Sequence, residues 1–138
     1  MIAIYSLVGF AAWTLTILIF TVGVYRWLHI IFRGAAVGGF SATEPEGSPF
    51  YKRAMRAHAN ALETLPVFGA VVLAAWARGI HTPWLDALSV VVLAARIVHS
   101  LIHLSVVQTD RVVSVRFTFL CFQLVALVAM LVIVVLHG

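Results

Sequence analysis

The segment that decides the fold is KRAMRAHANALETLPVFGAVVLAAWA, residues 52–77. It has a continuous helical pattern, but only fourteen uncharged residues separate Glu63 from Arg78. A helix needs roughly 20 apolar residues to cross the hydrocarbon layer of a bilayer. The spanning part of this helix must therefore include Glu63 and Asn60, and such side chains normally face the interior of a helix bundle. The segment predicts a membrane protein made of several packed helices.

Composition excludes a soluble domain. Of the 138 residues, 63% are hydrophobic and 10% are charged, with a mean hydropathy of +1.08, which leaves too little polar surface to cover a globule in water. Disordered chains have low hydrophobicity, and disulfide scaffolds have many cysteines, whereas this chain has only Cys121, in an apolar run. A transmembrane β-barrel is excluded because the apolar segments are continuous over about 20 residues and do not alternate with polar ones.

Polar breaks divide the chain into four expected helices. Their approximate bounds are 2–32, 51–78, 83–106 and 111–136, forming a single all-α membrane domain over residues 1–138. The stretch from 34 to 49 is the one long connection. Thr82 and Pro83 mark the start of the third helix, and Thr109 or Asp110 caps the fourth. Residues 1–25 lack a basic start and a cleavage site, so we interpret them as a retained helix.

Basic residues indicate the orientation in the membrane. The first connection is flanked by Arg26, Arg33, Lys52, Arg53 and Arg56. The third has Arg111 and, deeper, Arg116, whereas the opposite side has only Arg78 near a helix end. By the positive-inside rule, connections one and three face the cytoplasm and both termini lie opposite. The net charge of +4 is explained by orientation and headgroup contact, so we expect no nucleic-acid partner. The compact chain without a presequence suits a bacterial inner membrane.

Polar residues of the expected second helix fall on one face. At 100° per residue, Arg56, Asn60 and Glu63 lie within about 60° of one another. Arg53 lies about 60° from Arg56, at the edge of this stripe. The spacing predicts one polar face directed at other helices.

The third and fourth helices carry matching faces. Arg96, His99 and His103 fall within about 60° on the third helix, with Arg96 close to its middle. A charged residue there costs about 2.5 to 3.5 kcal/mol on insertion scales unless it finds a partner or a wet cavity. On the fourth helix, Arg116 shares a side with Gln123, seven residues later. We therefore expect these residues to meet inside the bundle.

Two interpretations of these stripes stay open. In the structural one, Glu63 neutralises Arg96 or Arg116 and the polar network only fixes packing. In the functional one, an anionic polar molecule enters from the cytoplasmic side, because Arg53, Arg56, Arg96 and Arg116 outnumber the single carboxylate. The planar guanidinium group suits carboxylates in particular.

A metal or haem site is not expected. His99 and His103 have the i, i+4 spacing of metal pairs, but no acidic third ligand and no haem-attachment pattern lies nearby. Cys121 lacks a neighbouring base and is interpreted as a packing residue.

Two motifs carry a resemblance to a known family. RAMRAHANALETLPVF, residues 53–68, resembles the second-helix signature of the MAPEG family, the membrane-associated proteins in eicosanoid and glutathione metabolism. The matching positions are Arg56, His58, Asn60, Glu63 and Pro66, with Phe68 one place late. ARIVHSLIHL, residues 95–104, is similar to the third-helix motif, in which an arginine and a histidine three later precede an aromatic residue. The resemblance extends over essentially the whole chain.

This resemblance implies a homotrimer of four-helix subunits, with glutathione as bound co-substrate in pockets between subunits that open to the cytoplasm. Arg56, Arg96 and an arginine of the fourth helix would hold its carboxylates. Glu63 would hold its amine, and Asn60 and His99 would add hydrogen bonds. The full set of candidate cofactor-binding residues is Arg26, Arg53, Arg56, Asn60, Glu63, Arg96, His99 and His103. The implied activity is that of a glutathione-dependent membrane transferase or peroxidase acting on hydrophobic electrophiles.

In catalytic members of the family, an arginine or serine near the start of the fourth helix stabilises the thiolate. The helical face favours Arg116 for this role, whereas the sequence distance from His99 favours Arg111. The chain departs from the family at His103, which replaces an aromatic residue, and at Ala59, where prostaglandin E synthases carry an arginine. The alternative is a non-catalytic MAPEG-like membrane protein that binds glutathione or an anionic lipid.

Overall fold

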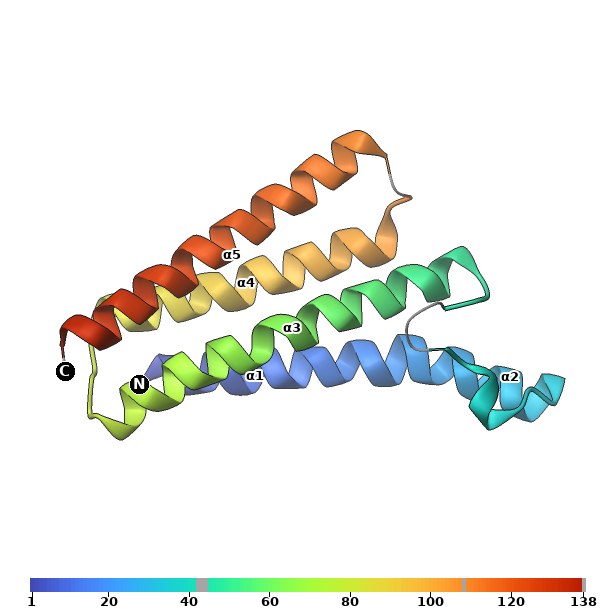
Figure 1. Cartoon of the computed structure of the whole chain (residues 1–138), viewed down its shortest axis with the longest axis horizontal. Coiled ribbons are helices and arrows are strands. Elements are labelled where there is room, and N and C mark those ends of the chain that lie inside the picture. Colours follow the sequence, from blue (N-terminus) through green and yellow to red (C-terminus); the bar gives the residue numbers. More distant parts are fainter. Residues whose placement is uncertain (42–44, 108, 138) are drawn as a thin grey trace.

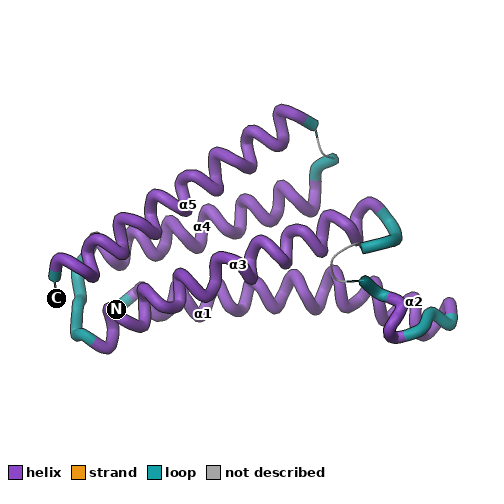
Figure 2. The backbone as a smooth tube through the Cα atoms, in the orientation of Figure 1, coloured by secondary structure: helices purple, strands orange, loops and turns teal. Residues whose placement is uncertain are grey.

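The computed structural model describes residues 1–41, 45–107 and 109–137, and within these ranges it contains helices and no strands (Figures 1 and 2). The first long helix consists of α1 (Ile2–Ile17), the π-helix η1 (Leu18–Gly23) and α2 (Val24–Arg33). It is followed by α3 (Pro49–Ala77), α4 (Pro83–Ser105) and α5 (Asp110–Leu136), while η2 (Val37–Gly39) is a 3-10 turn in the first connection. In these described ranges, four helices are long and apolar enough to span a membrane, which confirms the expected four-helix membrane fold.

The helices run up and down, so functional residues from distant parts of the sequence reach the same end. The N-terminus, the C-terminus and the α3–α4 turn lie at one end of the bundle (Figure 1). The other end holds α2, the first connection and the α4–α5 turn. In the interior, α4 packs against both α1 and α5, and α3 packs against α1 and α4.

Side-chain caps set the beginnings of three helices. Ser48 Oγ accepts a hydrogen bond from Tyr51 N at 3.2 Å with Pro49 at the first helical position, so α3 begins two residues earlier than predicted. Thr82 caps α4 as expected, since its Oγ1 accepts from Leu85 N at 3.1 Å. For α5 the cap is Thr109 and not Asp110, because Thr109 Oγ1 accepts from the N of Val112 at 3.4 Å. Gln108, which falls between the expected third and fourth helices, lies outside the described residues.

The π-helix changes the direction in which the first helix buries its side chains. The buried residues of α1 are Ala3, Ser6, Phe10, Thr14 and Ile17, at steps of three or four. The next buried residue is Val22, five positions after Ile17, and the wider turn of η1 absorbs the extra residue. A Cβ at Gly23 would lie 3.1 Å from Leu18 O, so glycine fits this turn. The phase shift brings Tyr25 and Arg26 toward α3, a feature that the uniformly apolar sequence did not predict.

The core is apolar at the end that holds both termini. Its central members are Ala3, Phe10, Ala61, Phe68, Val72, Leu85, Val92 and Met130. The rings of Phe10 and Phe68 lie 5.6 Å apart. Small residues let the helices approach closely, as in other membrane bundles. Within this part of α4 the buried polar side chain is Ser89, and the buried arginine and histidines of α4 follow from Arg96 onward.

Candidate functional site

The fully buried guanidinium group of Arg96 joins all four helices. Arg96 is 0% exposed, and its Nη2 donates hydrogen bonds to Thr64 Oγ1 on α3 and to Gln123 Oε1 on α5. The amide of Gln123 is fixed by a further bond from its Nε2 to Val92 O at 3.3 Å. From α1, the ring of Phe10 lies 5.6 Å from the guanidinium carbon. These partners are neutral, so Arg96 is held by dipoles and a ring face, with Glu63 attracting it from a greater distance.

Two buried histidines extend the polar network along α4. His99 Nδ1 lies 3.4 Å from Arg96 Nη1. The rings of His99 and His103 meet edge to face, with centroids 5.0 Å apart and an interplanar angle of 77°. The sequence-derived stripe of Arg96, His99 and His103 therefore faces the bundle interior, and all three side chains are buried.

A second cluster forms where α3, α4 and α5 meet nearer the first and third connections. Arg116 Nη1 of α5 lies 2.8 Å from His103 Nδ1 and 3.3 Å from His103 Nε2. The amide of Asn60 on α3 lies 3.3 Å from His103 Nε2. Arg56 on α3 is close enough to repel Arg116 electrostatically. We call Arg56, Asn60, His103 and Arg116 the outer cluster.

Arg56, Asn60 and Arg116 of the outer cluster are accessible, whereas His103 and Arg96 are buried. Arg56 and Glu63 are exposed on the surface of the single chain, and Asn60 and Arg116 are half-buried. Leu62 and Val67, the neighbours of Glu63 on α3, are 48% and 54% exposed. The polar stripe of α3 thus runs from the bundle interior onto an open face. A molecule approaching that face meets the outer cluster and Glu63 first.

Among the described residues, three expected site residues make no hydrogen bond or ring contact with either polar cluster. Arg26 Nε donates to Tyr51 Oη at 2.8 Å, and its guanidinium lies 5.4 Å from the ring centre of Phe40. Arg53 has a buried Nε without a hydrogen-bond partner. Arg111 is exposed in the first turn of α5. The structure brings Arg116, and not Arg111, to the histidines of α4.

Sequence reasoning missed two neighbours of Arg96. Thr64 follows Asn60 by four residues and so lies beside the polar stripe, a spacing that was available as a signal. Phe10 gave no signal, because it is one of many apolar residues in its helix. Both were overlooked because their role depends on the helix that packs opposite them.

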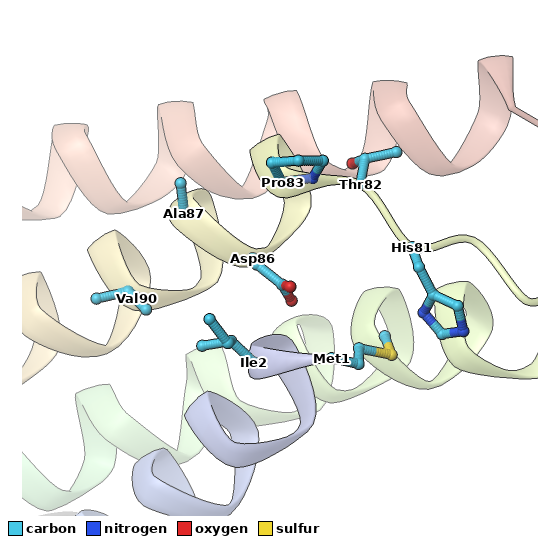
Figure 3. Close-up of a pocket in the computed structure, with 8 residues that line it drawn as sticks. All are labelled: Met1, Ile2, His81, Thr82, Pro83, Asp86, Ala87 and Val90. Atoms are coloured by element: carbon cyan, nitrogen blue, oxygen red, sulfur yellow. The ribbon is translucent and has the colours of Figure 1, made fainter.

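A surface pocket of about 490 Å³ lies at the end that holds the N-terminus (Figure 3). It is lined by Met1, Ile2, His81, Thr82, Pro83, Asp86, Ala87 and Val90. The carboxylate of Asp86, drawn between Ile2 and His81 in Figure 3, accepts a hydrogen bond from Ala3 N at 2.8 Å and so caps α1. The pocket contains none of the expected site residues. We therefore take the outer cluster with Glu63 as the candidate site.

Comparisons with known proteins give one match. The family model described as MAPEG family matches residues 4–136, nearly the whole chain. No curated protein and no solved structure matches the chain.

Proposed function

Because the chain belongs to the MAPEG family, we propose that it is a glutathione-dependent membrane transferase or peroxidase acting on hydrophobic electrophiles. Members of this family commonly use glutathione, and the family includes glutathione transferases, peroxidases and non-catalytic proteins. The observation that carries the proposal is the position of Arg116, which lies 2.8 Å from His103 on α4, beside Asn60 of α3, and is only half-buried. A guanidinium group at such an edge binds a carboxylate or thiolate through charge-assisted hydrogen bonds.

The exposed polar face of α3 supports assembly with further subunits. Glu63 lies fourteen residues from the end of α3 at Ala77, so at about 1.5 Å per residue it is inside the hydrocarbon layer. A carboxylate facing lipid is costly, and such groups are normally covered by protein or by a polar ligand. In the proposed homotrimer, a neighbouring subunit covers this face and glutathione fills the polar space between them. Lipid contacts the remaining apolar surface.

Each accessible residue has a role that its chemistry supports. Arg56 and Arg116 bind carboxylate and thiolate, since a guanidinium group donates to anions in a planar fork. Glu63 accepts from the ammonium group, and Asn60 contributes an amide. Arg96 acts as a positioning residue in this scheme, because its two Nη groups contact Thr64, Gln123 and His99 inside one subunit, while its buried Nε has no partner among the described residues.

The chemistry needs a thiolate. A free thiol has a pKa of about 8.5, and each unit of lowering requires about 1.4 kcal/mol of stabilisation of the charged form. One guanidinium group in a site of low dielectric can supply this amount. In the transferase reaction, the thiolate sulfur bonds to the electrophilic carbon, and the leaving group departs with the bonding electron pair. In the peroxidase reaction, two glutathione molecules are oxidised to the disulfide while a hydroperoxide is reduced to an alcohol and water.

The proposed orientation follows the basic residues. Connections one and three face the cytoplasm, both termini lie on the opposite side, and the membrane is a bacterial inner membrane. The outer cluster then lies in the cytoplasmic half of the bundle, where water-soluble glutathione enters. The hydrophobic electrophile reaches the thiolate from the lipid.

Thiolate absorbance on adding glutathione to the purified protein in detergent tests the proposal. We expect a saturable ultraviolet thiolate signal at neutral pH that is lost in Arg116→Ala. Lys52→Ala, which removes an exposed charge outside the site, is the matched control and should keep the signal. If Arg111→Ala abolishes the signal and Arg116→Ala does not, the assignment to Arg116 is wrong. Turnover of a halogenated nitroarene or a lipid hydroperoxide then distinguishes the two reactions.

A second measurement addresses the assembly. The mass of the protein in detergent, with the bound detergent accounted for, should correspond to three subunits. A mass that corresponds to one subunit would contradict the proposal that a neighbouring subunit covers Glu63. Saturable glutathione binding without a thiolate signal and without turnover would favour the non-catalytic alternative.

A further inference from the structure

We infer that His103 positions Arg116 for thiol activation and is not itself a contact of glutathione. This inference rests on the proposed function and assigns a distinct role within that site. It starts from the burial of His103, which is 6% exposed, while Arg116 beside it is half-buried and open on one side. A ligand at the outer cluster therefore reaches Arg116 without touching the imidazole ring.

The contact between the two residues determines the protonation of the ring. Guanidinium groups only donate hydrogen bonds, so His103 must accept with an unprotonated ring nitrogen. Arg116 Nη1 lies 2.8 Å from Nδ1 and 3.3 Å from Nε2, so it is close to both ring nitrogens. In this inference Nδ1, the nearer nitrogen, is the acceptor, and the proton of the neutral ring is assigned to Nε2.

The amide of Asn60 completes this arrangement. It lies 3.3 Å from His103 Nε2, and a protonated Nε2 needs an acceptor. In the structure the atom of Asn60 that lies 3.3 Å from Nε2 is Nδ2, so the inferred arrangement requires the side-chain amide to be flipped, which places its oxygen there as the acceptor. One helix thus fixes the tautomer, the second carries the ring, and the third presents the arginine.

Several cationic side chains surround His103, and their charges oppose protonation of its ring. Facing it are Arg56 and Asn60 from α3, His99 and Arg96 from α4, and Arg116 from α5. Three of these five groups are cationic. An imidazolium at this place would repel Arg116 and release it from its position.

The positioning role explains why a histidine replaces the aromatic residue that the family resemblance led us to expect here. A flexible arginine at the edge of a bundle samples many rotamers, and ordering it costs about 2 kcal/mol of side-chain entropy. An acceptor held 2.8 Å from one Nη removes that freedom before glutathione binds. The second Nη group and the Nε group of Arg116 remain as donors for the thiolate.

The experiment compares three substitutions at His103. Asn places an amide oxygen the same number of bonds from Cβ as Nδ1, Gln places one at the distance of Nε2, and Phe removes the acceptor while keeping a ring. We expect His103→Phe to raise the apparent pKa of bound glutathione by about one unit, a tenfold loss of thiolate below that pKa. His103→Asn should restore the signal to within about threefold, and His103→Gln should not. Affinity for glutathione should change less than threefold in all three variants.

Two results would overturn the inference. If His103→Phe weakens glutathione binding without changing the thiol pKa, then His103 contacts the ligand directly. If His103→Asn behaves as His103→Phe does, an acceptor at Nδ1 is not what matters. His81→Phe, which replaces an exposed histidine at the other end of the bundle, controls for the loss of a histidine as such.

A measurement without glutathione tests the contact itself and does not depend on whether the His103 variants fold. It also separates this inference from the proposed function. In protein with ¹⁵N-labelled histidine, the ring of His103 should show an unprotonated Nδ1 and a protonated Nε2. Arg116→Ala should shift both nitrogens toward a mixture of tautomers, and unchanged nitrogens would refute the contact. A parent protein that gives no thiolate signal would overturn the proposed function together with the activation role. A parent with a normal signal that His103→Phe leaves intact would overturn only the role of His103.

Discussion

Replacing Gln123 with leucine tests how much the neutral hydrogen-bond acceptors around the buried charge of Arg96 contribute to the free energy of unfolding. Gln123 is fully buried and accepts from Arg96 Nη2, so Gln123→Leu keeps the volume but removes one of the two oxygen acceptors of this guanidinium. A hydrogen bond to a charged group contributes roughly 1.5–3 kcal/mol in soluble proteins, whereas interhelical bonds in membranes average about 0.6 and reach about 1.7 kcal/mol. Because the donor is charged and fully buried, we expect a loss near the upper membrane value, about 1.5–2 kcal/mol.

A double-mutant cycle isolates this contact from general packing effects. Arg96→Met removes the charge and leaves the amide of Gln123 without its donor, and the Arg96→Met, Gln123→Leu double variant removes both partners. The double variant should be more stable than the sum of the single losses by about 1–2 kcal/mol, since replacing a buried polar pair by apolar groups is often nearly neutral.

The assay is reversible unfolding in mixed micelles, followed by circular dichroism at one fixed protein concentration. Ser89→Ala serves as a remote control, because Ser89 bonds to Ser6 in the opposite half of the bundle. The loss of unfolding free energy caused by Ser89→Ala should add to the loss caused by Gln123→Leu within about 0.5 kcal/mol. Additive losses for Arg96 and Gln123 as well would refute the reasoning that these two side chains depend on each other.

Three further outcomes follow from single contacts. Thr82→Ala should cost about 1 kcal/mol of unfolding free energy by removing the cap on Leu85 N, while Thr82→Ser should cost much less; equal losses would argue against the cap. Gly47→Ala should destabilise the first connection by about 1–3 kcal/mol, because φ there is +131° and an added Cβ would lie 2.5 Å from Tyr25 Oη. Part of that loss should be recovered in the Gly47→Ala, Tyr25→Phe double variant, and no recovery would place the strain in the backbone alone. Glu63→Gln should weaken glutathione binding about tenfold in calorimetry through loss of a charged contact to the ammonium group, and unchanged affinity would exclude this role.

Some residues were placed correctly by helical spacing alone. Arg96, His99 and His103 are spaced by three and four residues, so a helix through them presents all three on one side. Because the rest of this helix is apolar and spans the membrane, that side was predicted to face the bundle interior. The same rule favoured Arg116 over Arg111, and the structure places Arg116 beside His103. Spacing works here because it depends only on the geometry of a single helix.

Spacing did not reveal which partners two guanidinium groups contact within the subunit. Arg26, which the resemblance places among the ligand-binding residues, donates to Tyr51, which is 1% exposed and stacked on Tyr25 at 4.2 Å. Arg96, expected to hold a carboxylate, donates from Nη2 to the neutral side chains of Thr64 and Gln123. In both cases a partner more than twenty residues away in the sequence decides what the guanidinium group touches.

The sequence by itself determined that this chain is a membrane bundle of four helices with polar stripes facing inward, because hydropathy and helical periodicity are local properties. The tertiary structure decided which arginine is enclosed and which is open, where the first helix changes phase, and that Asn60, His103 and Arg116 meet. These outcomes depend on distances between side chains on different helices. Such distances are set by packing, which requires every helix to be in place at once.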